Sequence, residues 1–449
     1  MAAYRRCDRR AHTDRGGEMK ALPPIQAATP AERGAVSPAE TRLLLAQLGG
    51  GHHLNPIHMC VRYEGRIEAW QLYLAVRAVA SRHEALRTTF DVTPGGVTRD
   101  IRPQLNFHFS VKLQEDPRPG MLEAMLREIG RIMVATPYDD TTGPIFRVIL
   151  VQSIDACDYV VINVSHLACD AASLSLLLKS IFQAYDDPYG FAAMERGLQA
   201  IDFVASQARF LRSADLAESR AAMSLLASAR MTVKPFGRSR NGQRPPDRLA
   251  VSVHKLPDSY AKGNQRQAKA ITAAALVIAA IDPDAAPALL VPRMNRSACG
   301  AREIVGYLSN TIVVPLEIDR DQRLSGLLAG AARSLREAAA LESVPYALLV
   351  GQLDYPPNIS VNFFPAAFAR DWPRAWSVHP TALVPSMTTA FEIGFYIADS
   401  LGELHLQYFD DLVNASEAAR CGAMFVTAAA ALDGVERPVH DLLAALCID

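Results

Sequence analysis

The apolar positions in the first half of the chain change repeatedly between a period of two and a helical spacing. Segments with strand character are 58–67, 106–113, 146–152 and 157–166, and segments with helical character are 68–85, 122–138 and a stretch that begins near Ala172. Alternation of polar and apolar residues is typical of strands, whereas apolar residues three and four positions apart are typical of amphipathic helices. Strands that alternate with helices predict an α/β or α+β fold.

The first helix is predicted from its N-terminal signals. Ser37 is of a residue type favoured as an N-cap, Pro38 follows at the first helical position, and Glu40 completes a capping box. Three glycines at 49–51 end this helix. We therefore expect an ordered element that begins at Pro38.

The second half shows the same alternation. Helices are expected at 271–281 and 327–342, strands at 288–294, 309–318 and 358–364, and two more strands within 391–413 before a terminal helix. Between the halves, 231–248 is rich in Arg, Gly and Pro, which is typical of a connection between domains. The predicted organisation is a flexible basic and Pro/Ala-rich tail (1–35), an N-terminal lobe (36–230), a linker (231–248) and a C-terminal lobe (249–449).

Composition excludes several functional classes. The 449 residues include 46 Lys and Arg and 47 Asp and Glu, and this balance argues against general nucleic-acid binding, which depends on many cationic contacts to phosphates. No run of 18 apolar residues predicts a membrane helix, and the Arg-rich start lacks the apolar core of a secretory signal. We expect a cytoplasmic monomer whose seven cysteines, which lack metal-ligand spacing, are reduced thiols.

Because histidine titrates near neutral pH, the 11 histidines are the first candidates for chemistry. His52, His53 and His58 form a local cluster, but no carboxylate or cysteine is spaced to complete a metal site, so no metal is expected. His83 lies at a charged helix end, and a structural role is predicted for it.

His166 has a different setting. It follows the apolar stretch YVVINVS and precedes a helix, which indicates a tight turn from strand to helix. Asp170 lies about one helical turn further on, where its carboxylate can cap that helix. The positive end of the helix would keep a nearby imidazole neutral, and so usable as a base or a hydrogen-bond acceptor. Taken alone, HxxxD is a weak pattern that a buried structural histidine also explains.

A wider resemblance gives this turn its interpretation. The segment SHLACDA at 165–171 resembles the HHxxxDG motif of condensation domains of nonribosomal peptide synthesis, in the chloramphenicol acetyltransferase-like superfamily. The flanking segments SPAETRLL, YEGRI, RHEALRTTF, PYDDTTGPIFRV and AIDFVASQARFL agree with the family in order and spacing. In the second half, VPRMNRSACGAREIVGYLSNTIVVPLEI resembles the family's Arg motif followed by its Gly and Asn-Thr segment. The shared order of these pieces, over nearly the whole chain, carries the resemblance.

The resemblance implies two lobes of related fold, set in a V, with a tunnel between them that reaches His166. His166 matches the catalytic histidine, which would take a proton from an attacking amine or hydroxyl, or hold that nucleophile against a carrier-bound thioester. Asp170 matches a structural aspartate that pairs with an arginine, and Arg296 matches that arginine. The implied mechanism needs no covalent acyl-enzyme.

Two positions depart from the motif. Ser165 replaces the first motif histidine, which supports the loop, and its hydroxyl can still donate a hydrogen bond. Ala171 replaces the motif glycine, where an added methyl group could narrow one tunnel mouth and would be strained at a positive φ. The departures leave open an unusual acceptor or a loss of chemistry, whereas the presence of both His166 and Asp170 favours activity.

Other positions are placed by the resemblance alone. Ser309, Asn310 and Asn362 are candidates for lining the tunnel, although each can equally satisfy backbone groups at a strand end. Trp372 and Trp376 are interpreted either as part of a loop over the cleft or as local packing.

The resemblance implies a free-standing condensation enzyme, because neither a carrier attachment motif nor a Gly-rich nucleotide loop is found. It would transfer an acyl group from the phosphopantetheine thioester of a carrier protein in trans to an amine or hydroxyl, in nonribosomal peptide or hybrid polyketide biosynthesis, with no cofactor of its own. The acceptor could be free or carrier-bound. Because such carriers are typically acidic, the basic tail and residues 238–248 could serve in docking, or they could be solvated loops.

Two alternatives stay open. One is a coenzyme A-dependent acyltransferase of the same superfamily, whose plant-type members carry a DFGWG motif that is not found here. The other is a non-catalytic domain that recruits a carrier or a tailoring enzyme. Epimerisation is disfavoured because the expected additional glutamate pattern is not found, and heterocyclisation because His166 is present where those relatives carry aspartate.

Overall fold

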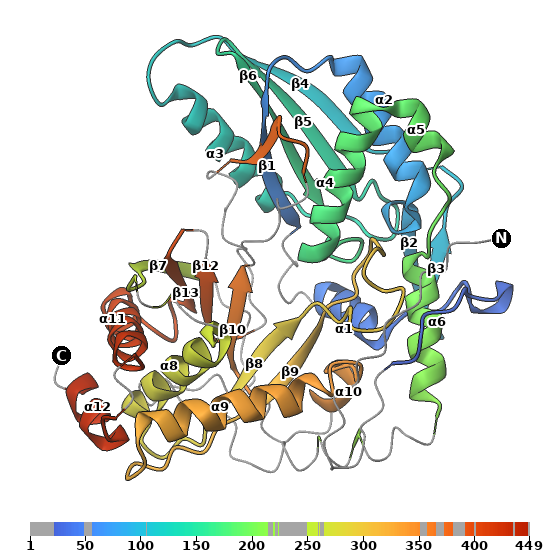
Figure 1. Cartoon of the computed structure of the whole chain (residues 1–449). Coiled ribbons are helices and arrows are strands. Elements are labelled where there is room, and N and C mark those ends of the chain that lie inside the picture. Colours follow the sequence, from blue (N-terminus) through green and yellow to red (C-terminus); the bar gives the residue numbers. More distant parts are fainter. Residues whose placement is uncertain are drawn as a thin grey trace.

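The chain forms two lobes, each built on its own β-sheet, as the computed structural model shows (Figure 1). The structure describes residues 22–48, 56–104, 106–213, 219–220, 223, 249–258, 260, 265–350, 357–364, 372–379, 391–398, 401–433 and 436–447. The linker expected at 231–248 therefore lies outside the described residues.

The first sheet contains five strands in the order β11-β1-β6-β5-β4. Their bounds are β1 Ile57–Glu64, β4 His108–Gln114, β5 Phe146–Ser153, β6 Cys157–Val164 and β11 Trp376–Val378, and a separate hairpin consists of β2 Thr88–Thr93 and β3 Gly96–Ile101. Strand β6 lies in the middle of the sheet and is buried from Asp158 to Val164. Burial on both faces explains why its sequence reads as a nearly continuous apolar run.

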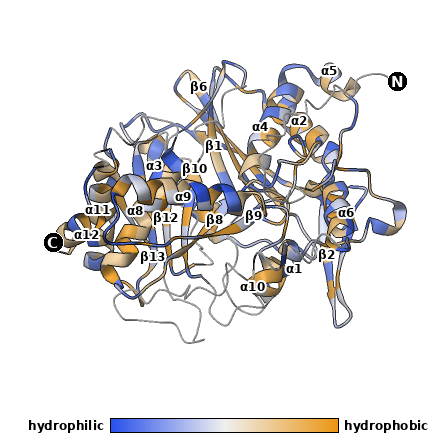
Figure 2. Cartoon of the chain, turned by 60° about the horizontal axis from the view of Figure 1, so that its bottom comes forward, coloured by the Kyte–Doolittle hydropathy of each residue, from blue (hydrophilic) through white to orange (hydrophobic). Residues whose placement is uncertain are grey.

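Helices cover both faces of this sheet. They are α2 Ala69–Arg82, α3 Met121–Ala135 and α4 Ala171–Asp186, with α5 Pro188–Ala193 packed against α4. Helix α6 Ala200–Leu211 packs instead in a core shared by the two lobes. In Figure 1, α3 lies on one side of the sheet and α2 and α4 lie on the other. Figure 2 shows hydrophilic and hydrophobic positions side by side on helices such as α6, as expected for amphipathic helices.

The second sheet contains six strands in the order β7-β13-β12-β10-β8-β9. The strands are β7 Leu249–Lys255, β8 Ala288–Arg293, β9 Asn310–Pro315, β10 Ile359–Phe364, β12 Ile393–Ala398 and β13 Glu403–Phe409, and the helices are α8 Arg266–Ile281, α9 Leu324–Ala339, α10 Ala347–Val350, α11 Ala415–Ala431 and α12 Val439–Leu446. Helix α8 is buried continuously from Ala268 to Ala279. Its many alanines allow close packing on every side, so α8 forms the centre of this lobe.

The two lobes repeat one strand topology. In each, the first strand pairs antiparallel with the last, β1 with β6 and β7 with β13. That last strand pairs antiparallel with the strand before it, which in turn pairs parallel with an earlier strand, β5 with β4 and β12 with β10. The prediction of two related α/β lobes is confirmed.

The lobes are not two consecutive pieces of chain. Strand β11 comes from the second half, yet it pairs with β1 in the first sheet. Its Trp376 ring stacks on Phe182 of α4 at a centroid distance of 4.1 Å, and Trp372 meets the same ring edge-on at 5.1 Å. Both tryptophans therefore pack locally in the first lobe, which is the second of the two interpretations that the sequence allowed.

The expected flexible tail needs a correction. Residues 1–21 lie outside the described residues, but from Leu22 onward the chain is ordered against α6. Leu22 and Ile25 are buried in a core shared with both lobes, and the backbone N–H of Ala28 donates to Asp202 Oδ1 at 2.7 Å. Two apolar side chains and a buried carboxylate hold a segment whose Pro/Ala-rich composition suggested a tail.

Helix α1 (Pro38–Leu48) begins where the capping signals predict. The backbone N–H of Glu40 donates to Ser37 Oγ, and the backbone N–H of Ser37 donates to Glu40 Oε2. Glu40 also forms a buried ion pair with Arg99 at 2.5 Å. Glu40 therefore both caps α1 and ties it to the β2–β3 hairpin through Arg99.

Candidate functional site

His166 lies on the turn between β6 and α4. The backbone N–H of Ser165 donates to Ile145 O at 2.9 Å, and that of Ala168 donates to Ser165 O at 3.0 Å, which closes the turn. Helix α4 then begins at Ala171, capped by Asp170 through a 2.8 Å hydrogen bond from the Ser173 backbone N–H. The strand ends and the helix starts within a few residues, so His166 is positioned by two rigid elements.

Asp170 joins this turn to the second lobe. Arg296 donates from both terminal nitrogens to the two carboxylate oxygens, at 2.7 and 3.0 Å. The backbone N–H groups of Leu308 and Ser309 and the Ser309 hydroxyl also donate to Asp170 Oδ2, each at 3.1 Å. Burial alone would raise the pKa of Asp170, but Arg296 and the N–H donors outweigh it and hold the pKa below the ordinary aspartate value.

A second contact next to this ion pair brings the two backbones together. Ser173 Oγ donates to Gly306 O at 2.6 Å and accepts from Gly306 N at 2.9 Å and from Arg296 at 2.7 Å. A Cβ at Gly306 would lie 2.6 Å from the Cβ of Ala200. Only glycine allows the segment 304–309 to approach both α4 and α6 so closely.

The side chain of His166 is largely buried. Its Nδ1 is buried without a hydrogen-bond partner among the described residues. The residue as a whole keeps partial exposure. Burial outweighs the nearby Asp170 carboxylate and lowers the pKa of His166 from its ordinary value, so the imidazole is neutral at neutral pH. A neutral ring with an unoccupied nitrogen is what a general base requires.

Tyr307 packs edge-on against His166, with ring centroids 5.3 Å apart and an interplanar angle of 87°. Burial raises the pKa of Tyr307 to about 12, so its phenol is neutral at physiological pH. Tyr307 follows Gly306 on the segment that bonds to Asp170. The segment from the second lobe therefore supplies both the support for the turn and one wall beside the histidine.

Ser165 and Ala171, the two residues that depart from the motif, both have described surroundings. The Ser165 hydroxyl donates to Asp140 Oδ1, and it accepts a hydrogen bond from the Leu167 backbone N–H at 3.3 Å. Ala171 occupies the first position of α4, and among the described non-glycine residues only Asn295 has a positive φ. The strain that a positive φ would cause at Ala171 is therefore not present.

The three residues predicted to line a tunnel have different contacts. Ser309 donates to Asp170. The Asn310 side chain is buried, where it donates to Glu342 O at 2.8 Å and accepts from the Tyr346 backbone N–H at 2.9 Å. Asn362 lies on β10, paired with Tyr396 on β12, and is partly exposed. The contacts of Ser309 and Asn310 account for their presence structurally, and a tunnel-lining role for the three stays a prediction.

Of the other candidate histidines, His58 and His83 lie within the described residues. His83 is the C-cap of α2, and burial lowers its pKa to about 4. His52 and His53 lie outside the described residues, and His58 lies on β1, where burial lowers its pKa to about 4. Within the described ranges, no group of three His, Cys, Asp or Glu side chains could hold a metal ion.

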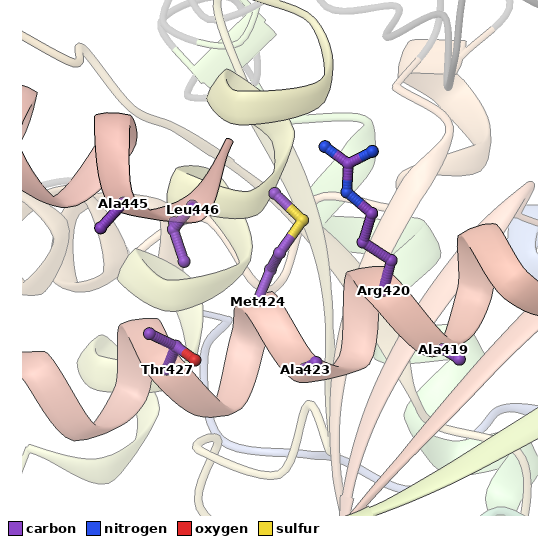
Figure 3. Close-up of a pocket in the computed structure, with 7 residues that line it drawn as sticks. All are labelled: Ala419, Arg420, Ala423, Met424, Thr427, Ala445 and Leu446. Carbon is purple, nitrogen blue, oxygen red and sulfur yellow. The ribbon is translucent and has the colours of Figure 1, made fainter. Parts of the chain in front are cut away.

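A cavity of about 300 Å³ lies far from His166 in the sequence and in the fold, between α11 and α12. Figure 3 shows its lining, which consists of Ala419, Arg420, Ala423, Met424, Thr427, Ala445 and Leu446. These side chains offer no base or nucleophile suited to acyl transfer. In addition, no helix of the described residues is long and apolar enough to cross a membrane.

Sequence reasoning did not single out Tyr307, Asp140 or Ser173 as parts of the site. Each lies inside or beside a segment that carried the resemblance, but no spacing rule connects it to His166. Their contacts include pairs that lie far apart in the chain, such as Ser173 and Gly306, which are 133 positions apart. Asp140 stands in PYDDTTGPIFRV, one of the segments that carried the resemblance, but nothing in that segment distinguishes it.

Comparison with known proteins agrees with this arrangement. A family model described as "Condensation domain" matches residues 34–369. Among curated proteins, the chain is 24% identical over 358 residues to a linear gramicidin synthase of Brevibacillus parabrevis, which covers 76% of this chain and 7% of the relative. It is 27% identical over 208 residues to bacitracin synthase 1 of Bacillus licheniformis, covering 44% of this chain and 4% of that protein. The chain thus spans less than a tenth of these relatives.

Solved structures share the fold at low identity. The starter condensation domain of a rhizomide synthetase, in complex with C8-CoA, superposes with a TM-score of 0.75 at 19% identity, covering 91% of this chain and 96% of the other. The X-domain from teicoplanin biosynthesis gives 0.75 at 20% identity, covering 93% and 99%. With the family model matching residues 34–369 around the turn that holds His166, the chain belongs to the condensation-domain family.

Proposed function

We propose that this chain catalyses acyl transfer from the phosphopantetheine thioester of a carrier protein to an amine or hydroxyl, with His166 as the general base. The observation that carries the proposal is the state of His166, a neutral imidazole whose Nδ1 has no partner among the described residues, on a turn held by the second lobe. The product is an amide or an ester in nonribosomal peptide or hybrid polyketide biosynthesis, and the carrier acts in trans.

The proposed step needs only this base. As the nucleophile attacks the thioester carbonyl, His166 Nε2 takes its proton, and a C–N or C–O bond forms. The C–S bond breaks, and the departing pantetheine sulfur takes the proton back from the imidazolium. A positioned base of this kind typically contributes about 10²- to 10⁴-fold in rate. The acyl group is never attached to the enzyme, so the acceptor must be bound before discharge.

The test is intact-protein mass spectrometry of an acyl-loaded carrier incubated with the enzyme and a panel of amines and alcohols. We expect loss of the acyl group that requires both an acceptor and His166, with His166→Ala reduced about 10²- to 10⁴-fold. His108→Ala is the matched control, because His108 lies exposed on β4. Equal discharge by His166→Ala and wild type would refute the role of His166.

A second candidate is a binding domain that recruits a partner without chemistry. This candidate is supported by an X-domain of similar fold, which has been solved in complex with OxyB. In that case a loaded carrier would bind with equal affinity to wild type and His166→Ala, and no acceptor would discharge it. A third arm uses acyl-coenzyme A as the donor, because a rhizomide starter domain of similar fold has been solved with C8-CoA.

A further inference from the structure

Arg42 is a cation for which the described residues supply no counterion. It lies on α1, is half-buried, and its guanidinium carbon sits 5.1 Å from the centroid of the Tyr346 ring. Among the described residues, no side chain forms an ion pair or hydrogen bond with this guanidinium. A cation that is partly removed from water costs free energy unless an anion or hydrogen-bond acceptors compensate it.

The nearby carboxylates are already used. Glu40, two positions before Arg42 on the same helix, accepts hydrogen bonds from Ser37 and pairs with Arg99 at 2.5 Å, and both side chains of that pair are only 2% exposed. Asp170 is saturated by Arg296 and by the donors at 308–309. Among the described residues, neither of these two carboxylates is therefore available to Arg42.

Arg42 is connected to His166 through one segment of the second lobe. Tyr346, whose ring lies beneath the guanidinium, is fixed by its backbone N–H to Asn310 Oδ1 at 2.9 Å. Three residues before Asn310, Tyr307 meets His166 edge-on at 5.3 Å. The positive charge of Arg42 also opposes the rise in pKa that burial causes at Tyr307 and Tyr346, as expected for a cation near both phenols.

The chemistry of the side chain selects the ligand. Guanidinium is a planar donor that matches carboxylate and phosphate oxygens and stacks on aromatic rings, as Arg42 does on Tyr346. A pantetheine arm is long, so the phosphate at its far end lies well away from a thioester held at His166. The carboxylate of a small acceptor is the other anion that acyl transfer to a free amine or alcohol would bring to this site.

We propose that Arg42 binds the carboxylate of the acceptor, so that the chain prefers a free amine or alcohol that carries a carboxylate. This inference rests on the proposed function and names the substrate class of the same site. Arg42 then fixes the orientation of the acceptor while His166 acts on the nucleophile. Its role is in acceptor binding, so its loss raises KM more than it lowers kcat.

The experiment compares matched acceptors on wild type, Arg42→Gln and Arg42→Lys. The pairs are leucine with leucinamide, phenylalanine with phenylalaninamide, and γ-aminobutyrate with its amide, each used with an acyl-loaded carrier and also in calorimetric binding without the carrier. We expect carboxylate members to bind wild type at least tenfold more tightly than the amides. Arg42→Gln should remove that preference with a loss of about 10- to 100-fold, the size of one charge-assisted contact.

Two controls separate recognition from folding. Arg77→Gln removes an exposed arginine from α2 and should leave the preference intact. Arg42→Lys keeps the charge without the planar fork and should retain part of the preference. Thermal melting of each variant shows whether the fold persists, so a loss of binding in a folded Arg42→Gln protein reports on the ligand contact.

The outcomes are distinguishable. Carboxylates and amides that bind wild type equally, or not at all, would overturn the assignment of Arg42. It would also be overturned if Arg42→Gln weakened binding of phosphopantetheine but not of pantetheine, because Arg42 would then hold the phosphate of the arm. A carboxylate preference that depends on Arg42 without any carrier discharge supports the inference and refutes the proposed function. Carrier discharge without a carboxylate preference would support the proposed function and refute the assignment of Arg42.

Discussion

Asp170 and His166 lie four residues apart on one turn, and the protein treats them in opposite ways. Asp170 is surrounded by donors from both lobes, while Nδ1 of His166 has no hydrogen-bond partner among the described residues. The pairing keeps Asp170 charged, whereas burial without pairing keeps His166 neutral. The contrast teaches that the polar contacts of this turn fix its position, and the histidine is left free to act on another molecule.

Removing the Asp170 carboxylate should have the largest effect on stability. Asp170→Ala leaves Arg296 buried without its partner, and we expect a loss of about 3 to 5 kcal/mol in the free energy of unfolding. Denaturant unfolding measures this directly. Asp170→Ala combined with Arg296→Met should lose less than the sum of the two single variants, because the pair acts as one unit. Full additivity would contradict the described network.

Removing the hydroxyl beneath the turn should have an intermediate effect. Ser165→Ala takes away the donor to Asp140, a buried carboxyl whose pKa burial raises, and leaves it poorly satisfied. We expect about 1 to 3 kcal/mol of destabilisation with the acyl-transfer rate reduced only in proportion to the folded fraction. Ser165→Thr should restore most of the stability. A stable Ser165→Ala that has lost activity would instead place Ser165 in the chemistry.

Acid should destabilise the protein through two of its buried histidines. His58 and His83 have pKa values near 4 in the fold and an ordinary value of 6.5. The unfolded chain therefore binds protons below about pH 6.5 that the folded chain refuses until about pH 4, and stability falls as the pH drops through that range. At pH 5 we expect a loss of about 1 to 2 kcal/mol for each histidine. His83→Gln should reduce the slope of thermal melting against pH, and an unchanged slope would contradict the burial of this ring.

Restoring the family glycine should have the smallest effect. Ala171 has helical geometry at the start of α4, so Ala171→Gly relieves no strain and costs about 0.5 to 1 kcal/mol of stability. We expect the acyl-transfer rate to change by less than a few-fold. A large gain in rate for Ala171→Gly would show that the methyl group blocks the approach to His166.

The sequence predicted the local parts of this account. The capping of α1 and the strand-turn-helix setting of His166 follow from nearest neighbours in the chain, and the two related lobes follow from repeated alternation of strands and helices. The resemblance also placed Arg296 opposite Asp170, and the structure contains that ion pair.

The rest depends on long-range packing. Nothing near Trp376 signals that β11 crosses to the first sheet, and the burial of Leu22 and Ile25 depends on α6, about 180 residues away. The Ser165–Asp140 contact and the Tyr307 ring beside His166 arise only when separate segments meet. Such contacts have no period or spacing in the sequence, so pattern analysis cannot supply them.

The central claim is that a neutral His166 removes a proton during carrier discharge. Its most direct test is the single-turnover discharge rate measured against pH. We predict a rate that falls at acid pH with a midpoint below 6.5, in line with the lowered pKa of the buried imidazole. His166→Ala should show a slow discharge without this dependence, and His108→Ala should match wild type. The same acid limb in His166→Ala as in wild type would contradict the account.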